Sequence, residues 1–303
     1  MQIKEFFESN YFPKRLLGKE GNASRLYRLS IRSFEKTLGR PPTLDDFTDD
    51  AILAHMQKVV ANKRASATAN KDREQLLCLW RYAFKLGLVK RWPEVPKFSE
   101  TIRIPTAWMA DDIEKLRQAA RKQEGDFCGV PRSDWWEAII AVCLDTAERI
   151  GAVSQCRWEW LSNGWLLIPA EVRKGGKRDK QFELDESTLK LLDKIKTSSP
   201  MLFPWPYCEN YLWMLYGDLV RSAGLPAGRR DKFHKLRRTT ASVAHSIGMN
   251  AQELLGHQQR RTTERYLDPR FTRDEQASAA LAKYLADPSI CHRHMQPKRR
   301  TGN

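Results

Sequence analysis

The stretch LLGHQQRRTTERYLDP, from Leu254 to Pro269, places a histidine, a basic pair, two adjacent threonines and a tyrosine close together along the chain. Its tyrosine, Tyr266, has two interpretations. It is a reactive hydroxyl, or it is one more aromatic ring packed against a core, which is the commoner role in an apolar setting. The stretch alone does not decide between them, so evidence for a reactive tyrosine has to come from the rest of the chain.

The composition favours a protein that binds a polyanion. The chain has 303 residues, a length typical of about two domains, and 41% of them are hydrophobic and 29% charged. That balance is ordinary for a soluble globular protein, but the net charge of +15 is not. Such an excess favours a polyanionic partner, and nucleic acid is commoner than an anionic membrane for a chain of this kind. A surface that is basic only for solubility is the alternative.

The cysteines and the apolar runs indicate a cytoplasmic protein without a membrane segment. The six cysteines include no C-x-x-C pair, which argues against a zinc site or a disulfide framework and fits a reducing compartment. The run Cys291-His292-Arg293-His294 looks metal-binding, but its Pro- and Arg-rich surroundings disfavour ligation. The start, MQIKEFFESN, lacks the apolar core of a signal peptide, and no apolar run approaches membrane-spanning length.

Residues 1–96 are expected to form a small helical domain. In ASRLYRLSIRSFEKTLG the apolar residues recur at helical spacing on one face. Four cations fall on the opposite face: Arg25, Arg28, Arg32 and Lys36. A solvated surface and a helix lying along phosphates both fit this stripe.

Two more helices are expected in the same domain. Thr48 is a good N-cap for a helix through about Val60, and another helix runs from about Ser66 to Gly87. Four further cations lie at the start of the second of these helices: Lys63, Arg64, Lys71 and Arg73. That helix is therefore basic at its N-terminal end and core-forming in its later turns.

A proline-punctuated linker, residues 97–107, is expected to lead into a larger domain, residues 108–303. This domain begins with helices, including a continuous one through WWEAIIAVCLDTAERIGAV. Three short strands follow, Arg157–Trp160, Trp165–Pro169 and Lys180–Leu184, with Asn163-Gly164 and Gly175-Gly176 as turns. Helices then continue to the end. The predicted fold class is mainly α with a small antiparallel β-sheet (α+β).

Four places in the second domain concentrate groups suited to phosphoryl transfer. The first is Arg149, which closes the apolar helix in TAERIGAV. A cation favours a helix C-terminus, and a partly buried guanidinium also suits a carboxylate or a phosphate. The second is the hairpin VRKGGKRDKQFEL, which carries Lys174, Lys177, Arg178 and Lys180 around two glycines. Its charged tip is either simply solvated or delivers an ammonium to a groove.

The third place is RRDKFHKLRRTTAS, in which His234 and Arg237 are one helical turn apart and can point to one spot. Three further cations lie beside them: Arg229, Arg230 and Lys232. The fourth place is the stretch quoted first, with His257 after a glycine and then Tyr266.

Taken in order, these groups resemble the tyrosine recombinase family, which includes phage integrases. HKLRRTTAS is similar to the family's H-x-L-R-H-x-x-A-[ST] segment, and LLGHQQRRTTERYLDP to its L-G-H-x-x-x-x-T-x-x-Y segment. TAERIGAVSQCRWEWL resembles the box around the family's first arginine, and Lys174 falls where the family has its hairpin lysine. The segment from Ser66 to Gly87 resembles the family's core-binding domain, so the resemblance covers nearly the whole chain. Four boxes in the right order form a specific signal.

The resemblance implies a site-specific recombinase or integrase that cleaves and rejoins DNA through a 3′-phosphotyrosine intermediate. The implied catalytic residues are Arg149, Lys174, His234, Arg237, His257 and Tyr266. Arg149 and Arg237 would clamp the two non-bridging phosphate oxygens, and His257 would add a hydrogen bond. Tyr266 would attack phosphorus.

The proton transfers have candidate residues as well. A tyrosine is protonated at neutral pH, so its attack needs a proton acceptor, and His234 is the best candidate. Lys174 would protonate the leaving 5′-oxygen, with Lys177 as the alternative because a glycine-rich hairpin leaves the register open. No carboxylate cluster suited to Mg²⁺ is present in the sequence, and the covalent bond conserves energy, so we expect no metal and no cofactor.

Two departures from the family pattern stand out. The family usually has an acidic residue three positions after its first arginine, where this chain has Ala152; Glu148 and Glu159 are the acids that could compensate. The segment from Gly248 to Leu254 is also shorter than usual, although the distance from His257 to Tyr266 is kept. Neither departure removes a catalytic group.

The implied partner is double-stranded DNA with a specific recombination site, held in a clamp formed by the two domains. The resemblance also implies a nucleoid-associated homo-tetramer on DNA, with DNA-bending accessory proteins as further partners. The tail RDEQASAALAKYL is expected to be an amphipathic helix that packs on a neighbouring protomer or on its own. Two rival functions are a DNA-binding protein that has lost activity and a type IB topoisomerase-like enzyme.

Overall fold

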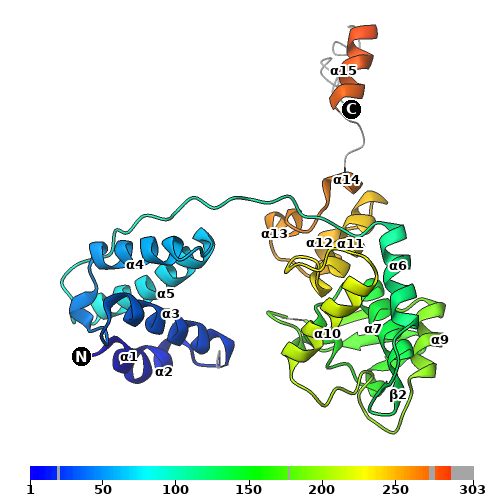
Figure 1. The fold of residues 1–303 in the computed structure, drawn as a ribbon, viewed down its shortest axis with the longest axis horizontal. Coiled ribbons are helices and arrows are strands. Elements are labelled where there is room, and N and C mark those ends of the chain that lie inside the picture. The colour runs from blue at the N-terminus through cyan, green and yellow to red at the C-terminus, as the bar shows by residue number, and fades with distance from the viewer. Residues whose placement is uncertain (19–20, 177, 273–276, 288–303) are drawn as a thin grey trace, which may run out of the picture. The chain divides into compact units, whose positions relative to one another are not determined.

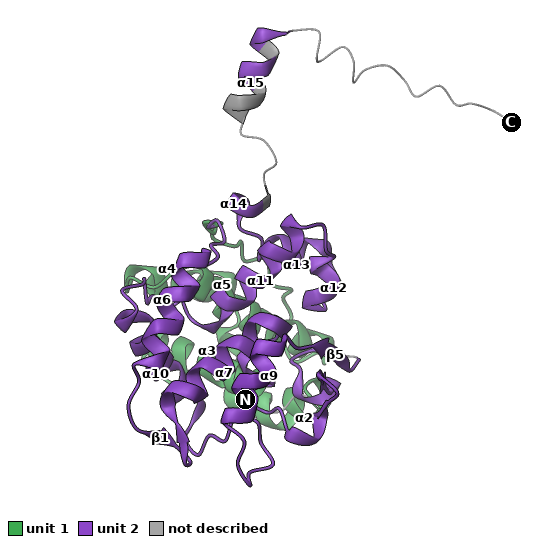
Figure 2. Ribbon diagram, turned by 90° about the vertical axis from the view of Figure 1, so that its right-hand side faces the viewer, with its two compact units in different colours: residues 1–102 green, residues 103–303 purple. Residues whose placement is uncertain are grey.

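The computed structural model describes residues 1–18, 21–176, 178–272 and 277–287, and divides the chain into two compact units (Figures 1 and 2). Unit 1 is Met1–Ile102 and unit 2 is Arg103–Asn303. The boundary between them falls inside residues 97–107, the linker expected from the prolines.

Unit 1 is helical. Its three long helices are α3 (Asn22–Leu38), α4 (Asp49–Ala61) and α5 (Ser66–Lys85), and both α3 and α4 pack on α5. Thr48 caps α4 as expected, because its side chain accepts a hydrogen bond from the Ala51 amide at 3.2 Å. The shorter elements are α1 (Ile3–Phe6), a π-helical turn (Phe7–Tyr11), α2 (Phe12–Arg15) and a 3₁₀ turn (Leu44–Asp46).

Unit 2 is mostly helical with two small antiparallel sheets. The helices before its main sheet are α6 (Ala110–Arg121), α7 (Arg132–Thr146) and α8 (Ile150–Val153), and β1 (Asp126–Phe127) pairs with β2 (Val130–Pro131). The helices after it are α9 (Glu186–Lys194), α10 (Glu209–Ser222), α11 (Phe233–Ser246), α12 (Ala251–Leu255), α13 (Arg260–Glu264), α14 (Pro269–Thr272) and α15 (Ala277–Ala286). The fold class predicted from the sequence is confirmed.

The three-stranded sheet has the order β3-β4-β5, formed by Leu161–Ser162, Trp165–Ile168 and Lys180–Glu183. The turn between β3 and β4 is the expected one, since Asn163 and Gly164 have φ of 50° and 80°, as a two-residue hairpin turn requires. The expected strand Arg157–Trp160 is wrong. Residues Trp158–Trp160 form a 3₁₀ turn instead, because Arg157 bridges to Met201 and the Trp158 amide donates to Pro200.

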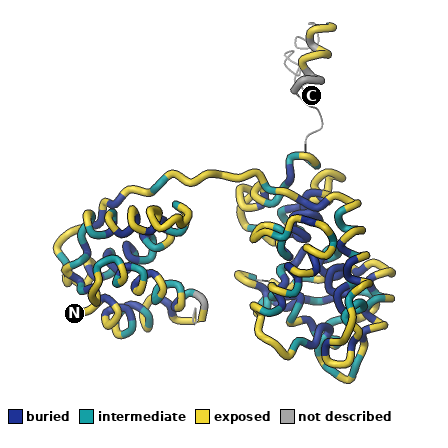
Figure 3. The backbone as a smooth tube through the Cα atoms, in the orientation of Figure 1, coloured by how far each residue is buried: buried dark blue, intermediate teal, exposed yellow. Residues whose placement is uncertain are grey.

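Helix α7 is the centre of unit 2, and most of the residues along it are buried (Figure 3). The sequence predicted that this helix continues past Arg149, and that is wrong. Ala147 adopts a left-handed conformation with φ of 50° and ends the helix, so Arg149 stands at the N-cap of α8 and not at a helix C-terminus. Arg149 therefore gains no stabilisation from the dipole of a helix C-terminus, contrary to the expectation from the sequence.

No helix within the described residues is both long enough and apolar enough to cross a membrane.

Candidate active site

Three of the residues singled out in the sequence meet at one point of unit 2. Arg237 lies in the second turn of α11, His257 follows α12, and Tyr266 follows α13. The ring centroids of His257 and Tyr266 are 5.0 Å apart, and the guanidinium carbon of Arg237 lies 5.5 Å from the Tyr266 ring centroid. Tyr266 is half-buried and so is neither a core ring nor a freely solvated one.

Arg237 is held rigidly within this cluster. Its side chain is 1% exposed. The two terminal nitrogens donate to the backbone carbonyls of Ala147 and Leu255, the latter at 2.8 Å. Burial lowers the pKa of Arg237, and the Glu148 carboxylate opposes that effect. The Nε of Arg237 is buried and has no hydrogen-bond partner among the described residues. A buried charged donor without an acceptor is costly, so this nitrogen is available to an acceptor from outside the chain.

Glu148 is one of the two acids considered as substitutes for the acidic residue that Ala152 replaces, and it lies beside the arginines of the site. Its Oε1 accepts from Nε and Nη2 of Arg173 at 2.8 and 2.6 Å, and its Oε2 lies 3.8 Å from Nη1 of Arg237. Oε2 also accepts from the Arg149 amide at 3.2 Å. Glu159, the other acid considered, is exposed and pairs with Arg157 at 2.7 Å.

The sequence did not single out Arg173, and it named Lys180 only as one of the hairpin cations; both residues join the hairpin to the cluster. Nη1 of Arg173 donates to the carbonyl of Arg178 at 2.9 Å, which closes the base of the hairpin. Nζ of Lys180 donates to the carbonyls of Glu253 and Leu254, at the end of α12. The only signal in the sequence was position, because Arg173 directly precedes Lys174 and Glu148 directly precedes Arg149.

Lys174 is exposed on this hairpin, just after the 3₁₀ turn Ala170–Val172. Lys177 lies outside the described residues, so its competition with Lys174 stays open. The guanidinium of Arg149 is partly buried and has no hydrogen-bond or ion-pair partner within the described ranges.

Both site histidines are neutral at pH 7. Burial and the neighbouring Arg237 and Arg149 cations lower the pKa of His257 to about 4. The pKa of His234 is also lowered to about 4, by the protein packed around it and by the neighbouring Arg237 and Arg149 cations, although His234 as a whole is exposed.

The hydrogen bonds of His257 define its tautomer. Nε2 faces Nη2 of Arg237 at 3.4 Å and must accept there, because a guanidinium can only donate. The proton therefore sits on Nδ1, which donates to Oγ1 of Thr263 at 3.1 Å. The imidazole is thus fixed in orientation from both sides.

Two of the basic residues assigned to DNA already have protein partners. Arg73 is buried: its Nε donates to the Val95 carbonyl at 2.9 Å, and its Nη1 pairs with Glu74 at 3.2 Å. It is therefore left out of the proposed phosphate contacts. Arg28 forms a two-point ion pair with Glu8 at 2.7 and 2.9 Å, which neutralises its charge.

Most of the other assigned cations are exposed on the two units. The exposed ones are Arg25, Arg32, Lys36, Lys63, Arg64, Lys71, Arg178, Arg229 and Arg230. Lys232 is half-buried and its Nζ donates to the Trp213 carbonyl at 2.9 Å.

The described residues contain no group of three or more His, Cys, Asp and Glu side chains that could hold a metal ion. The run Cys291-His292-Arg293-His294 lies outside the described residues.

Comparison with known proteins finds this fold in solved structures of DNA recombinases. No protein-family model and no curated protein matches the sequence. Among solved structures, a lambda integrase dimer bound to a COC′ core site is 19% identical with a TM-score of 0.70, covering 91% of this chain and 99% of that one. The Tn1549 transposon integrase with circular intermediate DNA is 14% identical with a TM-score of 0.70, covering 93% and 99%. The XerH site-specific recombinase bound to difH is 18% identical with a TM-score of 0.63, covering 89% and 80%. The chain therefore has the fold of the tyrosine recombinases.

Proposed function

We propose that this protein is a site-specific tyrosine recombinase or integrase that cleaves and rejoins DNA strands. The observation that carries the proposal is the convergence of Arg237, His257 and Tyr266, with an unsatisfied buried nitrogen on the arginine. A phosphodiester oxygen between these three side chains would supply the acceptor that this nitrogen lacks.

The arginines provide the electrostatic part of the reaction. A phosphodiester gains negative charge in the transition state, so donors fixed in advance where that charge develops lower the barrier. Arg237 is fixed by two backbone carbonyls and a carboxylate. Arg149 has an uncommitted guanidinium and completes a clamp on the non-bridging oxygens.

Each bond change has a residue assigned to it. The phenol oxygen of Tyr266 attacks phosphorus, a tyrosine–phosphate bond forms, and the bond to the 5′-oxygen breaks. The phenol proton passes to His234, which is neutral at pH 7 and can accept it. Lys174, or Lys177, gives a proton to the leaving 5′-oxygen. A 5′-hydroxyl of a second strand reverses these steps and rejoins the DNA.

His257 changes its role when phosphate binds. Its Nε2 accepts from Arg237 in the resting protein. An anion beside it offsets the two arginines that lower its pKa. The imidazole then takes up a proton and donates from Nε2 to a non-bridging oxygen.

Duplex DNA is the proposed partner, because the similar structures are complexes with DNA and the exposed cations suit a phosphate backbone. We also propose a tetramer on DNA, as one similar structure is a lambda integrase tetramer on a Holliday junction. Association with the nucleoid and help from DNA-bending proteins belong to the same proposal. Packing of α15 on a neighbouring protomer is part of it as well.

The test is covalent trapping on a suicide DNA substrate, which carries a nick beside the cleavage site so that the released end diffuses away. We expect the wild-type protein to become attached to DNA and Tyr266→Phe to bind equally well without attachment. Attachment that persists in Tyr266→Phe would overturn the nucleophile assignment. A wild-type protein that binds its own site but is never trapped would instead be a DNA-binding protein without the reaction.

A further inference from the structure

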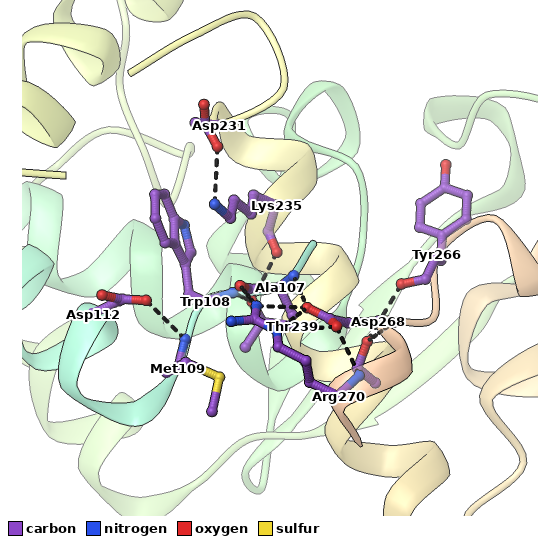
Figure 4. A network of polar contacts seen from close by, with 11 residues as sticks. Ala107, Trp108, Met109, Asp112, Asp231, Lys235, Thr239, Tyr266, Asp268 and Arg270 are labelled. Carbon is purple, nitrogen blue, oxygen red and sulfur yellow. Dashed lines mark hydrogen bonds and ion pairs between the residues drawn. The ribbon is translucent and has the colours of Figure 1, made fainter. Parts of the chain in front are cut away.

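Asp268, two residues after Tyr266, joins the nucleophile's segment to the end of the linker. Its side chain is 1% exposed, and its Oδ2 accepts from the Ala107 amide at 2.7 Å, across 161 positions of sequence. Arg270 strengthens this junction, since its Nη2 donates to Oδ2 of Asp268 at 2.6 Å and to the Ala107 carbonyl at 3.0 Å. Figure 4 shows these contacts together with Tyr266.

Helix α11 is the common support of the two joined segments. On the nucleophile side, Oγ of Ser242 accepts from the Asp268 amide at 2.9 Å and donates to the Tyr266 carbonyl at 3.4 Å. On the linker side, Oγ1 of Thr239 accepts from the Trp108 amide at 2.8 Å. Thr239 and Ser242 are one helical turn apart, so both segments rest on one face of the helix that also carries Arg237.

The linker end is itself firmly seated. Trp108 is 2% exposed, and Nζ of Lys235 lies 3.5 Å from its ring centroid. Burial alone would raise the pKa of Asp268, but the hydrogen bonds from Arg270 and the Ala107 amide outweigh it and hold the pKa below its usual value. The carboxylate is therefore ionised at neutral pH and keeps both partners.

We propose that Asp268 is a positioning residue for Tyr266, and that through it the end of the linker forms part of the nucleophile's support. In Figure 4 the ring of Tyr266 points away from these contacts while its carbonyl faces them. The contacts thus fix the backbone and leave the phenol to reach a phosphate. A displacement of the chain at Ala107 is carried to Tyr266 through one carboxylate. This proposal rests on the assignment of Tyr266 as nucleophile.

The decisive variant is Asp268→Asn, which keeps the shape of the side chain and removes its charge. The matched control is Asp112→Asn, which removes a carboxylate that accepts from the Met109 amide at 3.1 Å near the same linker end. Within the described residues Asp112 has no hydrogen bond to Asp268 and acts on Arg270 only through its charge. The readouts are the single-turnover rate of trapping on the nicked DNA at saturating protein, the Kd for that DNA, and Tm. We expect trapping to slow about 10-fold or more in Asp268→Asn with Kd unchanged, because small misplacements of a reacting group cost this much, and to stay at the wild-type rate in Asp112→Asn.

Amide hydrogen exchange of the free protein provides a readout that does not depend on the reaction. In Asp268→Asn, exchange should quicken both at residues 263–267 and at residues 107–109, and Asp112→Asn should leave residues 263–267 unchanged. Unaltered trapping in Asp268→Asn, or unaltered exchange at residues 263–267, overturns the positioning role. Absence of trapping in the wild type overturns the proposed function instead, and the exchange experiment still decides the link between the two segments.

Discussion

Arg73 and Arg237 are both buried arginines, one in each unit, and they differ in how their nitrogens are used. Every guanidinium nitrogen of Arg73 has an acceptor, either the Val95 carbonyl or Glu74. Arg237 is fixed by two of its nitrogens and keeps the third without a partner in the described chain, beside His257 and Tyr266. Burial of an arginine thus says little about its role, while an unfilled donor beside reactive groups points to a ligand.

Replacement of each arginine by lysine separates these two roles. A lysine keeps the charge but loses the planar set of donors. We expect Arg237→Lys to slow covalent trapping on the nicked DNA by about 100-fold or more, as loss of a fixed transition-state donor does. We expect Arg73→Lys to trap at the wild-type rate and to lower the free energy of unfolding by about 1–3 kcal/mol, since a buried carbonyl loses its donor. Urea unfolding of both variants measures the change in stability. Loss of covalent trapping in Arg73→Lys would contradict the distinction drawn between the two arginines.

Removal of the charge on Glu148 is expected to affect stability most among the acids near the site. Glu148→Gln leaves Arg173 and Arg237 buried beside a neutral amide, which costs about 3–5 kcal/mol for a broken buried pair. Glu159→Gln is the control, because its partner Arg157 is partly solvated and a surface pair contributes under about 1 kcal/mol. Denaturant unfolding measures the free energy of unfolding of both variants. Equal losses would contradict the proposal that Glu148 substitutes for the acidic residue absent at Ala152.

The smallest expected effect concerns pH. The pKa of His257 is lowered to about 4 from an ordinary value of about 6.5. Between these values the unfolded chain binds a proton that the folded protein does not, so the stability contribution is complete above pH 6.5 and is lost as pH falls toward 4. We expect His257→Gln to flatten the decline of Tm over that window. A decline as steep as that of the wild type would mean that other groups cause it.

The sequence predicted which residues come together better than it predicted what supports them. The spacings of Arg237, His257 and Tyr266 are nearly local, so a pattern along the chain preserves them. The position of Arg149 relative to its helix depended on a left-handed Ala147, which no residue type there announces. The burial of Arg73 depended on Val95 arriving from a distant segment.

The residues that support the site are held by long-range contacts, which a single sequence does not predict. Glu148 and Arg173 are 25 positions apart, and Ala107 and Asp268 are 161 apart. Their pairing follows from how the elements pack, and a single sequence carries no record of it. The strand expected at Arg157–Trp160 failed for a similar reason, since the pairing of Arg157 with Met201 is a long-range contact.

The buried ion pair at Glu148 has a consequence for the phosphate contact that we propose. One carboxylate is shared by two guanidiniums, Arg173 and Arg237, in surroundings where their side chains are 1–8% exposed. These three groups together carry one net positive charge. Under the proposed function, a bound phosphodiester would offset that charge, so its attraction to the site would come from the buried charge as well as from the hydrogen bonds it accepts.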